Sequence, residues 1–459
     1  MRRRHWLPLL ALLALSTAHA QESPAPPAAQ SQAQPEVAAS DDPDAADTAA
    51  TKVPLEEIRR FVGVFNAVRE AYVDPVDDRK LMQSAIKGLL LDLDPHSAYL
   101  EKSDAQAFDE ETNGAYAGIG VEVQVQPDGM IKVIAPIDDT PAARAGIKSG
   151  DLITAVDGKP VSGDNDDSQG PLRGAAGTRV TLTLLRQGVA KPFDVTLQRE
   201  TIKVASVRSR LLEPGLGYVR VAAFQADTAA DFERQLALLQ GPSGTALRGL
   251  VLDLRSNPGG LLTSAVQIAD DLLDRGRIVS TRGRIAVSDT LFSATPGDRL
   301  HGAPLVVLVD AGSASAAEVL AGALADNHRA RIVGSRTFGK GSVQTLLPLE
   351  NGDSIKLTTA RYYTPSGKSI QARGIAPDVV LHPAAGAPNG GHADYTEAVL
   401  PGHLRGEGEG DAGSNAGEVL DGDAPIAAAL SELKKQLAPA AAPSPQGAGP
   451  AQAKAKTGR

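Results

Sequence analysis

A serine and a lysine, 25 residues apart in the chain, are the residue types that could carry covalent catalysis. Ser315 follows the apolar run Leu305–Val309 through a turn of small residues, and a helix is predicted from Ala316. A side chain at a helix N-terminus lies beside free backbone N–H groups, which can stabilise an oxyanion. Small residues also suit a helix that packs closely on a sheet, so this stretch alone is only suggestive.

Lys340 lies between Gly339 and Gly341, and Gln344 follows the lysine by four residues. Flanking glycines allow another backbone to approach closely, which would leave the ammonium group poorly hydrated. Lost hydration lowers the pKa of a lysine, and the neutral amine can then accept a proton from a serine hydroxyl. A lone Gly-Lys-Gly is usually a surface turn, so this interpretation depends on the wider pattern.

A phosphate-binding loop is a different interpretation of the same lysine. Gly334–Lys340 matches the first seven positions of that motif. The next residue should be Ser or Thr to hold magnesium, and it is Gly341. We therefore reject a nucleotide site.

A Ser-His-Asp triad is the closer rival, with His328 as the base and Asp253 or Asp310 as its partner. His328 lies 13 residues after Ser315, beyond a predicted helix of about 11 residues. At 1.5 Å per residue, the two side chains would be roughly 15 Å apart, which is too far for proton transfer. The triad fails on distance.

The elements that would position these residues belong to an α/β core with a mostly parallel sheet, predicted over residues 201–383. The runs Leu250–Leu254 and Pro304–Val309 are largely apolar, which is typical of strands buried on both faces. Helical patterns alternate with these runs, as expected for parallel strands joined by helices. The predicted helices span Ala229–Leu239, Leu262–Asp271 and Ala316–Asp326.

Residues 114–200 show short runs of alternating apolar and polar residues separated by turns, which predicts a β-rich domain. It opens with Gly118, Ile119 and Gly120, where the glycines could turn N–H groups towards a carboxylate. Together with Thr140–Ile153 this stretch resembles a PDZ domain. Such domains add a peptide to a sheet edge and hold its C-terminal carboxylate in the loop, so the resemblance implies substrate binding at these three residues. A PDZ fold packed shut as a spacer is the alternative.

Apolar residues recur at helical spacing over residues 55–68 and 81–90, which predicts two amphipathic helices within an N-terminal helical segment at 53–110. A cap packed on the rest of the chain and a dimerisation surface are both compatible with this pattern. A homo-oligomer therefore stays open.

Residues 1–20 have the order of a secretory signal: a basic stretch, a short apolar run and small residues before cleavage after Ala20. We expect export to a periplasm. The chain has no cysteine, so no thiol can carry a lipid anchor, form a disulfide or act as nucleophile. The other predicted segments are a disordered tether at 21–52, a C-terminal extension with a short helix at 384–437, and a disordered tail at 438–459.

The formal net charge of the chain is −9. Removing the signal with its three arginines makes the mature chain more acidic still. This charge argues against nucleic acid and against an anionic membrane surface as partners.

The motifs around the serine and the lysine resemble those of the C-terminal processing peptidases, also called tail-specific proteases. The resemblance covers roughly residues 53–383 and includes a loop with a histidine, Leu93–Leu100. The matching stretches near the proposed chemistry are Gly312–Ala316, Phe338–Gln344 and Asp253–Gly260.

This resemblance implies a serine endopeptidase that acts on proteins with apolar C-termini, without metal or cofactor. A separate adaptor protein is compatible with it. Ser315 corresponds to the nucleophile, Lys340 to the general base, and Gln344 to the residue that orients the lysine. The resemblance also suggests backbone N–H groups of Gly259, Gly260 and Ala316 as the oxyanion hole.

Three other residues are predicted to be structural. We expect Asp253 and Arg255 to form an internal ion pair, and His96 to make local hydrogen bonds. The alternative outside the enzymes is a catalytically dead PDZ-containing binding or scaffold protein of the cell envelope.

Overall fold

The computed structural model describes residues 53–126, 130–161, 172–241, 244–383, 396–407 and 417–437. The chain divides into two units, Met1–Val73 and Asp74–Arg459. The predicted signal, tether and tail lie outside the described residues, as does most of the glycine-rich part of the extension. Within the described ranges, no helix combines the length and apolar character needed to cross a membrane.

The two amphipathic helices form as predicted. Helix α1 (Leu55–Ala71) is the element described in the first unit and has no buried residue. Helix α2 (Asp78–Leu91) opens the second unit, with the Asp77 side chain accepting a hydrogen bond from the Lys80 N–H as an N-cap. A short strand β1 (Ala98–Leu100) and helix α3 (Lys102–Asn113) follow.

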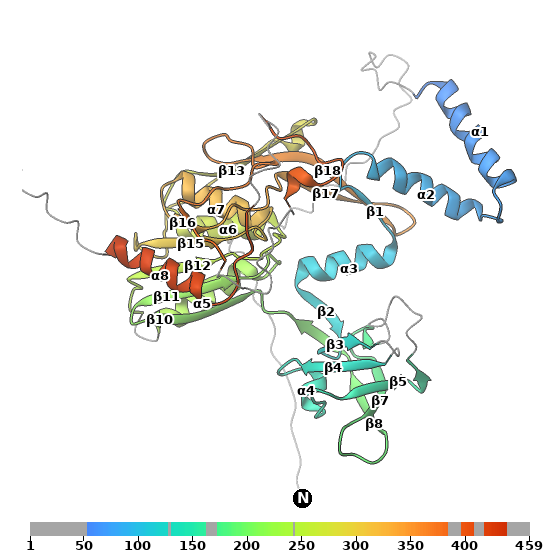
Figure 1. Ribbon diagram of the computed structural model, residues 1–459, viewed down its shortest axis with the longest axis horizontal. Coiled ribbons are helices and arrows are strands. Elements are labelled where there is room, and N and C mark those ends of the chain that lie inside the picture. Colours follow the sequence, from blue (N-terminus) through green and yellow to red (C-terminus); the bar gives the residue numbers. More distant parts are fainter. Residues whose placement is uncertain are drawn as a thin grey trace, which may run out of the picture. The chain divides into compact units, whose positions relative to one another are not determined.

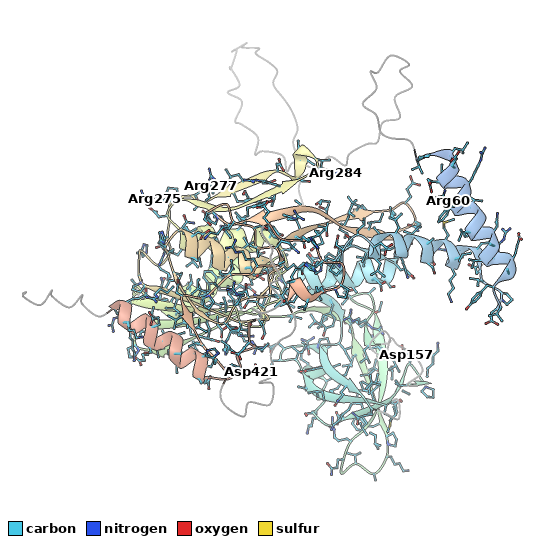
Figure 2. The ribbon with its side chains drawn as sticks, turned by 45° about the horizontal axis from the view of Figure 1, so that its top comes forward. Arg60, Asp157, Arg275, Arg277, Arg284 and Asp421 are labelled. Atoms are coloured by element: carbon cyan, nitrogen blue, oxygen red, sulfur yellow. The ribbon has the colours of Figure 1, made fainter. Side chains whose placement is uncertain are left out.

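The β-rich domain has a sheet in the order β3-β4-β5-β7-β8, with β6 paired to β5. Alternate residues of β7 face its core, where Val180, Leu182 and Leu184 are buried. Asp157, labelled in Figure 2, lies at the tight turn between β5 and β6 with a positive φ of 49°. The elements are β3 (Val121–Val125), β4 (Ile131–Pro136), α4 (Pro141–Arg144), β5 (Leu152–Val156), β6 (Lys159–Pro160), β7 (Arg179–Leu185) and β8 (Phe193–Gln198). An antiparallel pair, β2 (Ala115–Gly118) and β9 (Glu200–Lys203), brackets this domain.

The core is built on a six-stranded sheet in the order β10-β11-β12-β15-β16-β19. Strands β11, β12, β15, β16 and β19 run parallel, and β10 pairs antiparallel with β11 at one edge. The prediction of a mostly parallel sheet is confirmed. The strands are β10 (Val207–Glu213), β11 (Leu216–Val221), β12 (Gly249–Asp253), β15 (Leu305–Val309), β16 (Arg331–Gly334) and β19 (Val379–Val380).

Both faces of this sheet are covered, because its central strands are apolar on both sides. Val307 and Val309 of β15 point into a core shared with α5 (Thr228–Gln240), α6 (Leu262–Leu272) and α7 (Ala316–Asp326). Val306 and Leu308 point into a second core shared with α8 (Ala424–Leu437). Figure 1 shows α6 and α7 together and α8 apart from them, so α8 covers the face opposite α7.

A second sheet has the order β1-β18-β13-β14, with β17 also paired to β18. Tyr362 of β18 and Ile278 of β13 are buried in the core that contains α7. Strand β17 begins two residues after Lys340, so this sheet carries the lysine segment. Its elements are β13 (Arg277–Gly283), the 3-10 helix η2 (Ala286–Ser288), β14 (Thr290–Ser293), β17 (Ser342–Pro348) and β18 (Ser354–Tyr363), and a further 3-10 helix, η3 (Glu397–Val399), lies in the C-terminal extension.

Candidate active site

Ser315 is the N-cap of α7 and lies in a strained turn after β15. Its φ of 54° and ψ of −116° are unusual for a residue with a Cβ, and such strain is often retained at functional sites. The residue is only 8% exposed, and its side chain hydrogen-bonds with the buried hydroxyl of Tyr362. The strand, tight turn and helix have the arrangement of a nucleophile elbow.

The turn is locked against the loop that follows β12. The hydroxyl of Ser313 donates to the carbonyl of Leu254 at 2.7 Å and accepts from the N–H of Asp310 at 3.0 Å. The N–H of Ala314 donates to the carbonyl of Asn257 at 2.9 Å. Two loops distant in sequence are thereby fixed against each other beside the serine.

Gly259 and Gly260 allow this close approach. A Cβ on Gly259 would lie 2.8 Å from the Cβ of Ser315, and one on Gly260 would lie 2.2 Å from the Phe224 carbonyl oxygen. The Gly259 N–H already donates to Asn257 Oδ1 at 2.8 Å. Among the described residues, the N–H groups of Gly260 and Ala316 have no protein acceptor. The oxyanion hole stays a prediction, and these last two groups are the ones free to serve it.

Almost every backbone polar group around Lys340 is hydrogen-bonded. Over Phe338–Gly341, all four N–H groups and three of the four C=O groups have hydrogen-bond partners. The Phe338 N–H donates to the Ser313 carbonyl at 3.0 Å, which joins the lysine segment directly to the turn that carries Ser315. A Cβ on Gly341 would lie 2.2 Å from the backbone nitrogen of Gln371. The close approach of another backbone that was expected for this glycine is therefore confirmed.

Glu318 is the residue that sequence reasoning missed. Its side chain is fully buried on the first turn of α7. Oε2 accepts from the backbone N–H groups of Ser315 at 2.8 Å and Lys340 at 2.9 Å. Oε1 accepts from the Gly339 N–H at 2.7 Å and the Thr337 hydroxyl at 2.5 Å. One carboxylate therefore holds the backbones of both proposed catalytic residues.

A sequence signal for Glu318 does exist. Ser315 and Glu318 have the spacing of a capping box, in which the residue three positions into a helix reaches back to the N-cap N–H. That pattern predicts the contact with Ser315 but not those with Gly339 and Lys340. Burial raises the pKa of Glu318 to about 7, against the hydrogen bonds from Thr337 and the backbone, which lower it.

The pKa of Lys340 is shifted in the direction expected from the sequence. Burial lowers the pKa of its amine, and the nearby charge of Lys356 lowers it further. Glu397, Glu318 and Asp94 act in the opposite direction. The net effect favours the neutral amine, which is the form able to accept a proton.

Gln344 lies on β17 beside Lys340 in sequence, but its amide is used elsewhere. It donates to the hydroxyls of Ser342 at 3.0 Å and Thr358 at 3.3 Å. In the part of the chain that the structure describes, no hydrogen bond joins Gln344 to Lys340. Its orienting role stays a prediction.

The expected ion pair of Asp253 and Arg255 is present. Arg255 Nη2 lies 2.7 Å from Asp253 Oδ2, which also accepts from the Tyr218 hydroxyl at 2.7 Å. Arg255 further donates to the carbonyls of Leu420 and Gly422. The pair therefore fastens the C-terminal extension to the end of β12.

The expectation of local hydrogen bonding was wrong for the ring of His96. Its backbone N–H does donate locally, to Asp94 Oδ1 at 2.8 Å. The ring Nε2, however, lies 2.8 Å from Glu397 Oε2, 301 residues along the chain. Sequence spacing cannot reveal a partner at that separation.

The two rival chemistries lack the necessary geometry. Helix α7 spans the predicted Ala316–Asp326, so Ser315 and His328 lie beyond opposite ends of an 11-residue helix. The segment after Lys340 enters strand β17, whereas a phosphate-binding loop must open a helix.

The proposed carboxylate loop lies between β2 and β3. Gly120 has a φ of 75°, and a Cβ there would lie 2.3 Å from the Thr140 side chain, so glycine is required. Among the described residues, the N–H groups of Ile119 and Gly120 have no acceptor. A small cavity of about 30 Å³ lies beside them and is lined in part by Tyr116 and Arg173. Arg173 stacks over the Tyr116 ring.

Comparisons with known proteins identify the families that this chain resembles. Residues 215–381 match Peptidase family S41, residues 117–197 match the PDZ domain, and residues 18–104 match the activating protease CtpB N-terminal domain. A carboxy-terminal-processing protease of Bartonella bacilliformis is 44% identical over 385 residues, covering 83% of this chain and 88% of that protein.

Two further proteins are similar. The carboxy-terminal processing protease CtpA of Bacillus subtilis is 36% identical, covering 69% of this chain and 67% of that protein. The solved photosystem II D1 C-terminal processing protease is 35% identical with a TM-score of 0.41, covering 70% of this chain and 92% of that chain. Since the chain spans most of a relative with 44% identity and matches the peptidase family over its core, it belongs to the C-terminal processing peptidases of family S41, which are serine peptidases with a PDZ domain.

Proposed function

We propose that this chain is an exported endopeptidase that recognises protein C-termini through its PDZ domain and cleaves by a Ser315–Lys340 dyad. The observation that carries the proposal is the Glu318 carboxylate, which accepts hydrogen bonds from the backbone N–H groups of both residues. A merely structural cap needs only the first of these bonds. The second fixes a lysine of lowered pKa next to a strained serine.

In the proposed reaction, Ser315 Oγ attacks the scissile carbonyl carbon while the neutral amine of Lys340 takes the hydroxyl proton. The tetrahedral oxyanion accepts hydrogen bonds from the free N–H groups of Gly260 and Ala316. Lys340 then gives its proton to the leaving amine, which leaves an acyl-enzyme ester on Ser315. Water attacks the ester carbon while Lys340 takes one of its protons; the bond from that carbon to Ser315 Oγ then breaks, Oγ takes the proton back from Lys340, and the fragment leaves with a new C-terminal carboxyl group.

Substrate selection is assigned to the PDZ loop. The PDZ fold implies binding of peptide C-termini, and the free N–H groups of Ile119 and Gly120 suit a carboxylate. The cavity beside them is lined by apolar side chains such as Val121 and Leu172. We therefore propose that protein tails with an apolar C-terminal residue are the preferred substrates.

Export and assembly form a second part of the proposal. The signal-like residues 1–20 support a periplasmic location after cleavage at Ala20. The apolar faces of α1 and α2 are exposed within their own units, with Phe61 at 48% and Leu89 at 66%. We propose that such faces pair with a second copy of the chain or with an adaptor protein.

The test uses the purified mature protein and its Ser315→Ala and Lys340→Ala variants, each checked for folding by circular dichroism. Each is incubated with a loosely folded protein that ends in an apolar residue, and with a twin whose C-terminus is amidated. Mass spectrometry identifies the products. We expect cleavage by the wild type alone, weakened by amidation because the PDZ loop loses its carboxylate.

Cleavage retained by either variant would refute the dyad. Equal cleavage of the amidated twin would remove the PDZ loop from substrate selection. Binding of the tail without cleavage by any of the three proteins, with or without candidate adaptors, would favour the catalytically dead scaffold.

A further inference from the structure

The lysine segment is held from a second side by residues of the chain's C-terminal part. The Gly341 N–H donates to Gln371 Oε1 at 3.0 Å, and Gln371 Nε2 donates to Glu397 Oε1 at 2.8 Å. The backbone N–H of Glu397 donates to the Phe338 carbonyl at 3.1 Å. Glu397 therefore contacts one end of the Phe338–Gly341 segment directly and the other end through Gln371.

Glu397 is itself fixed by the turn that follows α2. Its side chain is fully buried, and its Oε2 lies 2.8 Å from Nε2 of His96, whose side chain is 15% exposed. Burying a carboxylate costs free energy unless it is hydrogen-bonded. The contacts with His96 and Gln371 therefore offset the cost of burying Glu397. Three segments far apart in sequence thus meet at one carboxylate.

Four charged groups influence the pKa of the Lys340 amine, each from a different element: Lys356 of β18 lowers it, and Glu397 of η3, Glu318 of α7 and Asp94 of the turn after α2 raise it. Each oxygen of Glu318 already accepts two hydrogen bonds.

The hydrogen bonds of Asp94 are concentrated on one oxygen: Oδ1 accepts from the N–H groups of His96 and Ser97 and from the Thr358 hydroxyl, whereas Oδ2 accepts from the Ser97 hydroxyl. Among the residues that the structure describes, Glu397 has one hydrogen-bond partner on each side-chain oxygen. A carboxylate oxygen can accept two hydrogen bonds, so Glu397 and Asp94 Oδ2 both keep accepting capacity. Glu397 is distinguished by its bonds to the lysine segment, because its N–H donates to the Phe338 carbonyl and its side chain accepts from Gln371, which in turn accepts from the Gly341 N–H.

We propose that Glu397 is a positioning residue for the reaction, acting through Lys340, and that His96 and Gln371 hold it in place. The inference rests on the proposed Ser315–Lys340 function. When Lys340 takes the proton of Ser315, it becomes an ammonium ion in a poorly hydrated place. Glu397 then supplies the opposite charge and an acceptor, until the proton passes to the leaving amine.

The test compares Glu397→Gln, His96→Gln and His96→Leu with the wild type. Glu397→Gln keeps the size of the side chain and removes its charge. His96→Gln keeps an N–H donor in place of Nε2, whereas His96→Leu removes it. The matched controls are Glu418→Gln and His382→Leu, because His382 and Glu418 form a pair of the same 2.8 Å length in which His382 is 76% exposed.

The readouts are kcat and KM for tail cleavage, the pH profile of kcat, and the pH dependence of Ser315 labelling by a fluorophosphonate. We expect Glu397→Gln to lower kcat about tenfold or more with little change in KM. The acid limb of both pH profiles should move to lower pH, because a carboxylate that raises the lysine pKa is gone. His96→Leu should lose kcat similarly, His96→Gln should recover most of it, and the control pair should behave as wild type.

An unchanged kcat and acid limb in folded Glu397→Gln would overturn the inference, as would an equal loss in the control variants. Should Glu397→Gln not fold, the contrast between His96→Leu and His96→Gln decides: equal activity of the two would overturn it. If the wild type is neither labelled at Ser315 nor active, the proposed function falls and this inference falls with it. If the wild type is labelled and active while Glu397→Gln matches it, only the inference falls.

Discussion

At the scale of single residues, the site depends on carboxylates that touch backbone rather than the reacting atoms. Glu318 binds four donors from two separate loops, and no other acidic side chain in the described ranges bonds to both Ser315 and Lys340. The bonds from Glu318 to Ser315 and Lys340 reach backbone N–H groups, so they fix the two backbones without using the serine hydroxyl or the lysine amine.

We predict that Glu318→Gln inactivates the enzyme. Each oxygen of Glu318 accepts two hydrogen bonds, and in glutamine one of these oxygens becomes an NH₂ group that cannot accept. At least two hydrogen bonds are therefore lost, and the loops that carry Ser315 and Lys340 separate. Misplacement of this kind should lower kcat about a hundredfold or more. The loss of buried hydrogen bonds should also reduce the free energy of unfolding by about 1–3 kcal/mol. Peptidase assays and urea unfolding measure both; a fully active, stable variant would contradict the role of Glu318.

We predict that activity rises with pH into the alkaline range. The pKa of Lys340 is lowered chiefly by burial, and below that pKa the amine is charged and cannot accept the serine proton. Below pH 7 the protonation of Glu318, whose pKa is about 7, should reduce activity further. A pH profile of kcat tests this. His328→Ala should leave the profile unchanged; loss of activity in that folded variant would revive histidine as the base.

At the scale of elements, the two faces of the parallel sheet have separate tasks. Helix α7 carries Ser315 and Glu318 on one face, while α8 closes the opposite face with Ile426, Ala429 and Leu433. Gly249 of β12 permits this closeness, since a Cβ there would lie 3.1 Å from Leu433. The C-terminal helix therefore stabilises the sheet without touching the chemistry.

We predict that Leu433→Ala lowers the free energy of unfolding by about 2–5 kcal/mol, because Leu433 is fully buried and the cavity is only partly refilled. The partly buried Leu430→Ala should cost less. Urea unfolding measures the difference. Activity per folded molecule should equal that of the wild type, and a fall in kcat at full folding would show that α8 does influence the site.

At the scale of the whole molecule, apolar surface is left uncovered on the N-terminal helices. Helix α1, which carries Arg60 in Figure 2, buries none of its residues within its own unit, and Ile58, Phe61 and Val62 are each nearly half exposed. Exposed apolar helix faces of this kind are typical of surfaces that meet another protein.

We predict that the full chain self-associates through this helix. Phe61→Ser combined with Ile58→Ser should lower the molecular mass measured by light scattering at micromolar concentration, because the buried apolar area is lost. A matched Arg60→Ser variant should keep the mass of the wild type. A monomeric wild type would instead favour an adaptor as the partner of this face.

The sequence by itself determined the family and the fold class of the protein. Apolar runs predicted the parallel strands, because a strand buried on both faces has no polar alternation, and the predicted helix Ala316–Asp326 is the observed α7. The glycines beside Lys340 predicted a close backbone approach, which Gly341 makes to Gln371. These features are local, since a few neighbouring residues encode each of them.

Only the tertiary structure decided which groups surround the lysine. Glu318 and Lys340 are 22 residues apart, and His96 and Glu397 are 301 apart, so no local period or motif joins them. The ring of His96 was expected to bond locally, and Gln344 was expected to bond the lysine rather than Ser342 and Thr358. Such partners are set by how strands and loops stack in three dimensions, because burial compels each polar group to bond whatever donor or acceptor the fold places beside it.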